Sequence, residues 1–193
     1  MGGLSLLMRR RAIQSHPTEG DNVLLSVSQL FAPSSTSDNS YIINTGINIF
    51  SDNYQRWLLR VSLADINYSA LGTTATAVTC GDESGSPYSG IFVAKDNNNN
   101  RIKVDINPGN AFFSVTAYLV TTFDAMFKRE GDVLYASRDN GTTYEVVMAS
   151  IQSTLQRSPR LANVPLMIGG YYDKDGQVGR PFYGHITCIL EKI

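Results

Sequence analysis

One polar segment near residue 170 combines the residue types that a sugar-binding site needs. Tyr171 and Tyr172 are followed by Asp173 and Asp175, within a predicted polar loop over Tyr171–Gly179. Aromatic rings stack on apolar ligand faces, carboxylates accept hydrogen bonds from hydroxyls, and loops carry such residues more often than scaffold strands do. Because the chain contains 10 tyrosines, two of them in one loop are weak evidence for a binding site. An ordinary solvated turn is the competing interpretation.

Two oxygen donors in the same loop are also candidate ligands for a metal ion. Asp173 and Asp175 flank a lysine and precede Gly176, so two oxygen donors of the kind that Ca²⁺ prefers lie beside a predicted tight turn. No glutamate closes the pattern, and solvated turn residues are the alternative. Asp82 beside Glu83 is a second acidic pair. Asp82 with Tyr88, and the run 97–100 (NNNN), are further candidate sugar-binding positions.

Residues that could catalyse a reaction are sparse. The E-x-D pairs at 19–21 and 130–132 each contain a glycine, which indicates turns. A G-x-S-x-G nucleophile elbow and a phosphate-binding G-x-x-x-x-G-K loop are both missing from the sequence. We therefore expect a non-enzymatic protein. Glycoside hydrolysis, which needs paired carboxylates, is retained as an alternative.

The cysteines do not predict zinc. Cys80 and Cys188 form no C-x-x-C pair, and the only histidines are His16 and His185. A disulfide and two buried free thiols are the alternatives that the sequence leaves open.

Composition favours one globular domain of 193 residues with a polar but weakly charged surface. Hydrophobic residues make up 42% of the chain and charged residues 17%, against roughly 25% in average globular proteins. The net charge of -1 argues against nucleic acid as a partner, since binding phosphates requires a basic surplus. Neutral polar partners such as sugars suit this surface better.

Residues 1–20 read as an arm, and residues 21–193 as the folded domain. Arg9, Arg10 and Arg11 follow a short apolar patch, whereas in a secretion signal the charge comes first. No apolar run approaches a membrane span, so we expect no membrane insertion and folding in a cytoplasm. The arm is either a disordered tail or an attachment segment, with its arginines in contact with a larger assembly.

Strand periodicity dominates residues 21–193. In Tyr54–Asp65, the residues Trp57, Leu59, Val61 and Leu63 share one face at period two, and this predicts a core strand containing Trp57. Further strands are predicted over 22–31, 41–50, 74–80, 90–95, 101–106, 112–121, 125–129, 133–137, 143–148, 165–169 and 182–190. The turns between them carry Gly, Asn and Asp, and the one predicted helix spans 149–159. Many short strands separated by turns predict an all-β sandwich or barrel.

Three segments, in the correct order, resemble the concanavalin A-like and laminin-G-like domains. They are Tyr41–Phe50 (YIINTGINIF), Val133–Gly141 with its "LY…G" hairpin, and Pro165–Ile186 with its "LMIGG" and "FYGHI" strands. The resemblance covers residues 21–193 and implies an antiparallel jelly roll of two sheets. Gly169 and Gly184 fit positions where strands approach closely. The E-x-D-x-E type of strand that carries the acids of hydrolases in this superfamily does not occur here.

Within that superfamily, the chain looks most like domains of tailed-phage fibre or head-decoration proteins. This resemblance implies a lectin-like domain on the virion surface, made in the host cytoplasm and attached to other virion proteins by its arm. It also implies a homo-oligomer, with a trimer favoured, that binds carbohydrate on a cell surface, and a calcium ion at the loop rim. A purely structural capsid or baseplate protein is the alternative.

Overall fold

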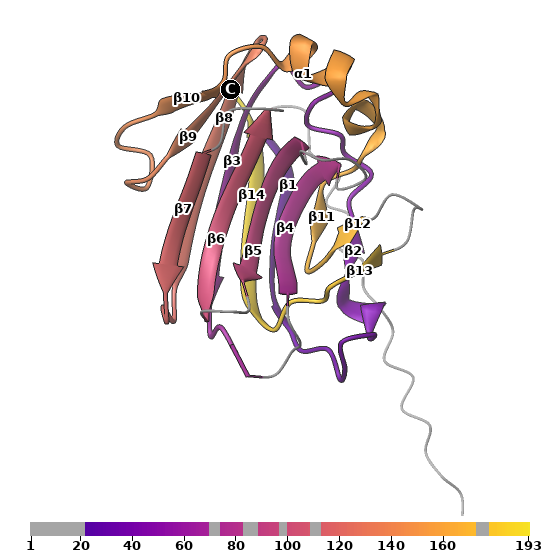
Figure 1. The fold of residues 1–193 in the computed structure, drawn as a ribbon, viewed down its shortest axis with the longest axis vertical. Helices are drawn as coiled ribbons and strands as arrows, with labels where there is room; N and C mark the ends of the chain where they lie inside the picture. The colour runs from indigo at the N-terminus through magenta and orange to yellow at the C-terminus, as the bar shows by residue number, and fades with distance from the viewer. Residues whose placement is uncertain (1–21, 70–73, 83–88, 97–99, 109–112, 173–177) are drawn as a thin grey trace, which may run out of the picture.

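A computed structural model describes residues 22–69, 74–82, 89–96, 100–108, 113–172 and 178–193. Two antiparallel six-stranded sheets pack face to face as a jelly-roll sandwich, as predicted (Figure 1). Sheet A has the order β1 (Val23–Phe31), β14 (Gly184–Lys192), β3 (Arg56–Ala64), β8 (Phe123–Glu130), β9 (Val133–Ser137) and β10 (Glu145–Met148). Sheet B has the order β2 (Ile43–Asn44), β11 (Met167–Ile168), β4 (Thr74–Asp82), β5 (Ser89–Asp96), β6 (Arg101–Pro108) and β7 (Phe113–Tyr118).

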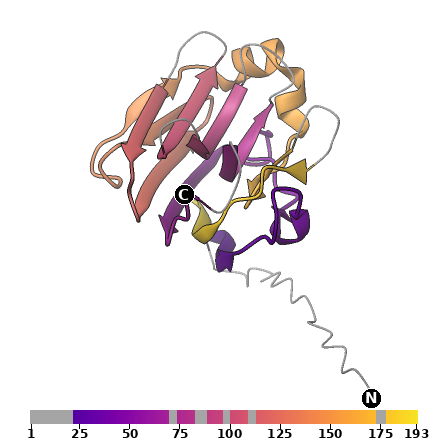
Figure 2. The same ribbon diagram turned by 60° about the horizontal axis from the view of Figure 1, so that its bottom comes forward.

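Smaller elements lie at the margins of the sandwich. A two-stranded ribbon pairs β12 (Tyr171–Tyr172) with β13 (Val178–Gly179). Among the described residues, the helical elements are η1 (Asn39–Tyr41), α1 (Ile151–Arg157) and η3 (Pro159–Asn163). α1 covers one end of the two sheets (Figure 2). The predicted helix is confirmed: the Ser150 hydroxyl caps its start by accepting from the Ser153 N–H, and Pro159 follows its last turn.

The core between the sheets confirms the periodicity of the best predicted strand. Trp57, Leu59, Val61 and Leu63 of β3 are all buried, and they share one core with the buried Ile102, Val104 and Ile106 of β6 in sheet B. Burying each such side chain contributes about 1.5–3 kcal/mol. Trp57 is therefore a core residue and not a ligand platform, as predicted.

The predicted turns bring neighbouring strands together. Glu130 pairs with Val133 across Gly131, which has φ of +62°, and β9 reaches β10 through Asn140 and Gly141, both at positive φ. β5 and β6 pair as the predicted hairpin, from Ser89 with Pro108 to Asp96 with Arg101. Asn and Gly adopt these left-handed conformations at low cost, so the turn chemistry fixes each register.

The predicted strand over Tyr41–Phe50 is wrong except at Ile43–Asn44. Asn44 accepts a hydrogen bond from the Gly46 N–H, and Asn48 accepts one from the Phe50 N–H. These side chains replace the bonds of a strand ladder, and Gly46 has φ of +71°. The segment is therefore a series of turns, although Ile49 and Phe50 at its end are fully buried.

Gly169 and Gly184 both lie where the chain leaves no room for a side chain, as predicted. Gly169 has φ of +78°, and a Cβ there would overlap the Phe31 ring. A Cβ on Gly184 would lie 2.9 Å from Phe182 Cε1 and 3.0 Å from the Ala64 carbonyl oxygen. The Gly169 approach brings the end of β11 in sheet B against β1 of sheet A, whereas the Gly184 approach lies within sheet A.

Both cysteines are free thiols on the core side of the sandwich. Cys80 lies in β4 of sheet B and Cys188 in β14 of sheet A, and both are buried. Of the two alternatives that the sequence left open, a disulfide and two buried free thiols, the structure has the free thiols. Among the helices of the described segments, none has the length and apolarity to cross a membrane. Arg9, Arg10 and Arg11 lie outside the described residues.

Candidate functional site

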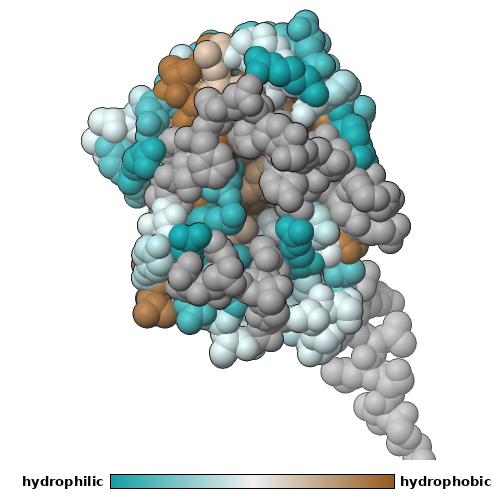
Figure 3. Space-filling view, viewed as in Figure 1, coloured by the Kyte–Doolittle hydropathy of each residue, from teal (hydrophilic) through white to brown (hydrophobic). Residues whose placement is uncertain are grey.

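The outer face of sheet B carries a row of side chains that point away from the core. Cross-strand pairing aligns Met167 with Thr79, Thr79 with Phe92, and Phe92 with Asp105. Their neighbours Ile168, Val78, Val93 and Val104 belong to the core, so alternation places this row outside. Figure 3 looks onto this face, where both hydrophilic and hydrophobic residues reach the surface.

Three side chains of this outer row are nevertheless withdrawn from solvent. Met167 and Thr79 are fully buried, and Phe92 is 8% exposed. Phe92 lies across Gly81, where a Cβ would overlap its ring. Within the described part of the chain, nothing hydrogen-bonds the Thr79 hydroxyl, although such groups normally have a partner when buried.

The ribbon β12–β13 lies beside β4 and brings an aromatic ring together with a cation. The guanidinium carbon of Arg180 lies 4.4 Å from the centroid of the Tyr171 ring. The Arg180 carbonyl accepts a hydrogen bond from the Thr76 N–H at 2.9 Å, which fastens the ribbon to β4. Arg180 has φ of +52°, a conformation costly for a non-glycine residue, so these contacts hold strained backbone in place.

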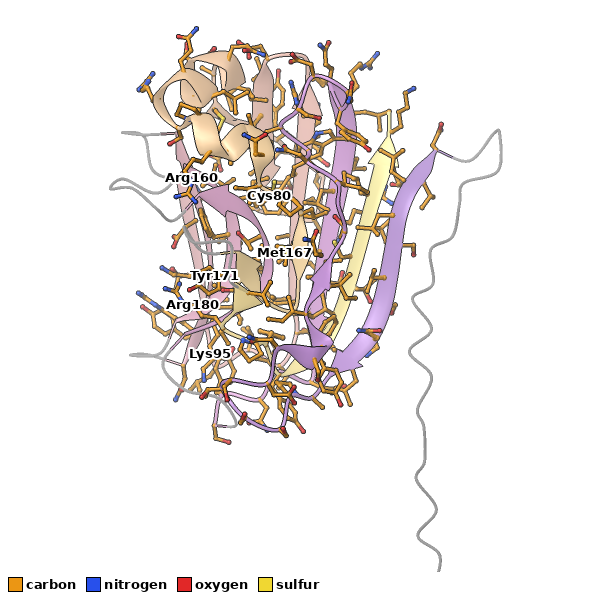
Figure 4. The ribbon with its side chains drawn as sticks, turned by 90° about the vertical axis from the view of Figure 1, so that its right-hand side faces the viewer. Cys80, Lys95, Arg160, Met167, Tyr171 and Arg180 are labelled. Atoms are coloured by element: carbon orange, nitrogen blue, oxygen red, sulfur yellow. The ribbon has the colours of Figure 1, made fainter. Side chains whose placement is uncertain are left out.

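Basic and acidic groups surround the outer row. Arg160 of η3 and Arg180 project to the same side of sheet B as Tyr171 (Figure 4). The Lys103 ammonium pairs with the Asp105 carboxylate at 2.6 Å. Lys95 belongs to the opposite side: it is buried, its ammonium donates to the Tyr68 carbonyl, and burial lowers its pKa.

The predicted site residues fall partly on this face. Tyr171 begins β12 and is half-buried, whereas the predicted polar loop is in part a paired ribbon. Tyr172 continues β12, and Asp173 and Asp175 lie outside the described residues. Arg180 was not predicted, because only the tertiary contact with Tyr171 singles it out.

The other predicted positions lie mostly beyond the described residues. Asp82 ends β4, whereas Glu83, Tyr88 and positions 97–99 are outside the described ranges. Within those ranges, no group of three or more His, Cys, Asp or Glu side chains could hold a metal ion.

The acidic pair Glu130 and Asp132 flanks a turn, as its central glycine predicts. The Asp132 carboxylate accepts from the Ser150 hydroxyl at 2.6 Å and from the Gln152 N–H at 2.7 Å. Burial raises the pKa of Asp132, but these hydrogen bonds and the nearby Arg129 charge outweigh it and lower the pKa overall. This carboxylate therefore fixes the start of α1 as an anion.

Comparison with known proteins finds solved structures of similar fold but no protein family for this chain. No family model matches the chain, and no curated protein has a significantly similar sequence. A carbohydrate-binding module of a Ruminococcus gnavus sialidase, bound to α2,3-sialyllactose, has 8% identity and a TM-score of 0.48, over 88% of this chain and 91% of the module.

Two other solved structures are similar over most of this chain. A leech intramolecular trans-sialidase has 8% identity and a TM-score of 0.48 over 89% of this chain, which spans only 26% of the enzyme. Domains LG4-5 of the mouse laminin α1 chain have 10% identity and a TM-score of 0.43, over 88% of this chain and 43% of theirs. At these values the fold assignment rests on this chain's own strand order.

Proposed function

We propose that this protein is a non-enzymatic, lectin-like domain that binds carbohydrate on the outer face of sheet B, beside the ribbon. The observation that carries the proposal is the stacked pair of Tyr171 and Arg180 next to β4. A half-buried ring offers a sugar an apolar surface, while a guanidinium donates hydrogen bonds in a fixed geometry. This combination suits a ligand that is apolar on one face and rich in hydroxyls at its edges.

The energetics of the site favour weak binding by one copy. A single aromatic contact contributes about 0.5–1.5 kcal/mol beyond its buried area. Useful affinity then requires several copies, because linked sites raise avidity without any new contact. We therefore propose that the domain acts as a homo-oligomer.

The setting that we propose is the virion surface. Arg9, Arg10 and Arg11 of the N-terminal arm would attach the domain to other virion proteins, and the sandwich would face cell-surface glycans. Asp173 and Asp175, which lie between Tyr172 and Val178 in the sequence, would be the ligands of a calcium ion.

A structural role without a ligand is the second candidate, and one observation favours it. Met167, Thr79 and Phe92 face outward from sheet B but are already buried, so little of the centre of that face remains for a ligand. A decoration protein would use the same sandwich only to bury surface against its neighbours.

A glycan-array and cell-surface screen of the full chain, with calcium and again with chelator, tests the proposal. Saturable binding that is lost in Tyr171→Ala supports a lectin, and loss with chelator adds the metal. No binding by an oligomeric sample would favour the structural role.

A further inference from the structure

The edge strand β1 is the longest exposed sheet edge in the described structure. It spans Val23–Phe31 and, among the described strands, pairs only with β14, so alternate residues direct backbone N–H and C=O groups away from β14. Figure 4 shows β1 beyond β14 at the margin of sheet A. The other edge strands are shorter: two residues in β2, four in β10 and six in β7. Free edges of this length are templates for pairing with another strand.

The usual devices that protect an edge are present elsewhere but missing from β1. β10 carries Glu145, which is paired with Arg138, and its register shifts between Val146 and Met148. At the other edge of sheet B, Arg101 of β6 places its guanidinium over the Tyr118 ring, so a positive charge lies beside the edge strand β7. The nine residues of β1 (VLLSVSQLF) include neither a charge nor a proline. Its one irregularity lies between Val23 and Leu25, which leaves Leu25–Phe31 in continuous register.

The edge is also held rigidly and is exposed to solvent. The Ser28 hydroxyl bonds His185 Nε2 at 3.0 Å and the Thr187 hydroxyl at 2.9 Å, which fastens β1 to β14 on the outer face. Ser26, Ser28 and Gln29 are exposed, and Leu30 is 52% exposed. A strand fixed in this way loses little conformational entropy when a second strand is added.

We infer that β1 pairs antiparallel with β1 of a second copy of this chain, joining the two A sheets into one continuous sheet. Antiparallel self-pairing is isologous, so each strand presents the same neutral edge to the other and no like charges meet. The regular run Leu25–Phe31 is centred on Ser28, so Ser28 lies beside its own counterpart and Ser26 lies opposite the second Leu30. This two-fold contact produces a dimer, not the trimer expected from the sequence.

Sedimentation of the full chain over a range of concentrations tests the pairing. We expect a monomer–dimer equilibrium, because one strand pair makes a small interface. Ser28→Lys places two like charges together and should weaken dimerisation at least about tenfold. Ser28→Ala, which removes only the hydrogen bonds to His185 and Thr187, should retain the dimer. Ser62→Lys introduces the same charge at an exposed position of β3 in the interior of the same sheet, and this variant should also retain the dimer.

A disulfide trap tests the register. Cys80 and Cys188 are buried, so Ser28→Cys supplies an accessible thiol, and directly opposed Cα atoms at about 4.5–5.5 Å lie within disulfide reach. Oxidation should give a covalent dimer, and Ser62→Cys should not. A monomer at every concentration, a trimer, or a dimer unaffected by Ser28→Lys would overturn the inference. These results are independent of glycan binding.

Discussion

Trp57 and Arg129 lie opposite each other in β3 and β8 and donate hydrogen bonds to the same carbonyl oxygen. Trp57 Nε1 reaches Ile49 O at 2.8 Å, and Arg129 Nη1 reaches it at 3.1 Å. Arg129 also donates to the carbonyls of Ser51 and Gly131, each at 2.8 Å. The pair therefore ties the turns that follow β2 to the β8–β9 turn of sheet A.

Replacing this buried guanidinium should destabilise the domain. Arg129→Met removes three charge-assisted hydrogen bonds, although Trp57 still donates to the Ile49 carbonyl and the Tyr54 N–H to the Ser51 carbonyl. We therefore expect a loss of roughly 2–3 kcal/mol in the free energy of unfolding. Arg60→Met is the matched control, because Arg60 is 44% exposed and its ion pair with Glu191 should contribute less than about 1 kcal/mol. Urea denaturation measures both. Equal losses of unfolding free energy in the two variants would show that the buried Arg129 contributes no more than the exposed ion pair.

Two glycines at positive φ should differ in their response to alanine. A Cβ on Gly131 would meet nothing within 4 Å, so Gly131→Ala should cost only the backbone strain, roughly 1 kcal/mol. Gly169→Ala adds an overlap with the buried Phe31 ring, and we expect a total above about 2 kcal/mol. Thermal unfolding compares them, and a Gly169→Ala variant as stable as Gly131→Ala would contradict the close approach.

Local patterns predicted the sandwich better than they predicted the site. The period-two row from Trp57 to Leu63 and the Asn-Gly and Gly-Asp turns specify strands and hairpins directly. The turns over 44–50 were missed because Asn44 and Asn48 bond their neighbours' N–H groups, which overrides an apolar sequence. Arg180 contacts Tyr171 only because the ribbon brings the two residues together, and such a contact has no characteristic spacing in the sequence by which it could be predicted.

The two thiols should be inert in the native protein. Burial raises the pKa of Cys80 and of Cys188 to about 12, and the thiolate is the reactive form. Thiol reagents at mildly alkaline pH should therefore modify neither residue until denaturant is added, when both should react. Rapid stoichiometric labelling of the folded chain would show that the sandwich opens at these positions.

The turn between β9 and β10 should contribute stability that depends on pH. The Thr143 N–H, the Thr143 hydroxyl and the Ser137 hydroxyl donate to the Asp139 carboxylate and lower its pKa to about 2. Because the folded pKa is below the ordinary carboxyl value of 3.8, this stabilisation is complete above that value and is lost as the pH falls through about 2. The stability difference between the wild type and Asp139→Asn should shrink over this window. A difference constant with pH would contradict the assignment.

Carbohydrate binding by the full chain is the central claim, and titration with a glycan selected on the array tests it most directly. The comparison is between Tyr171→Ala and Tyr118→Ala, since both tyrosines face an arginine but Tyr118 lies on β7, away from the ribbon. We expect affinity to fall at least about tenfold in Tyr171→Ala, the equivalent of 1.4 kcal/mol, and to be unchanged in Tyr118→Ala. Equal affinities in both variants, or no glycan bound by the wild-type oligomer, would contradict a lectin site at the ribbon.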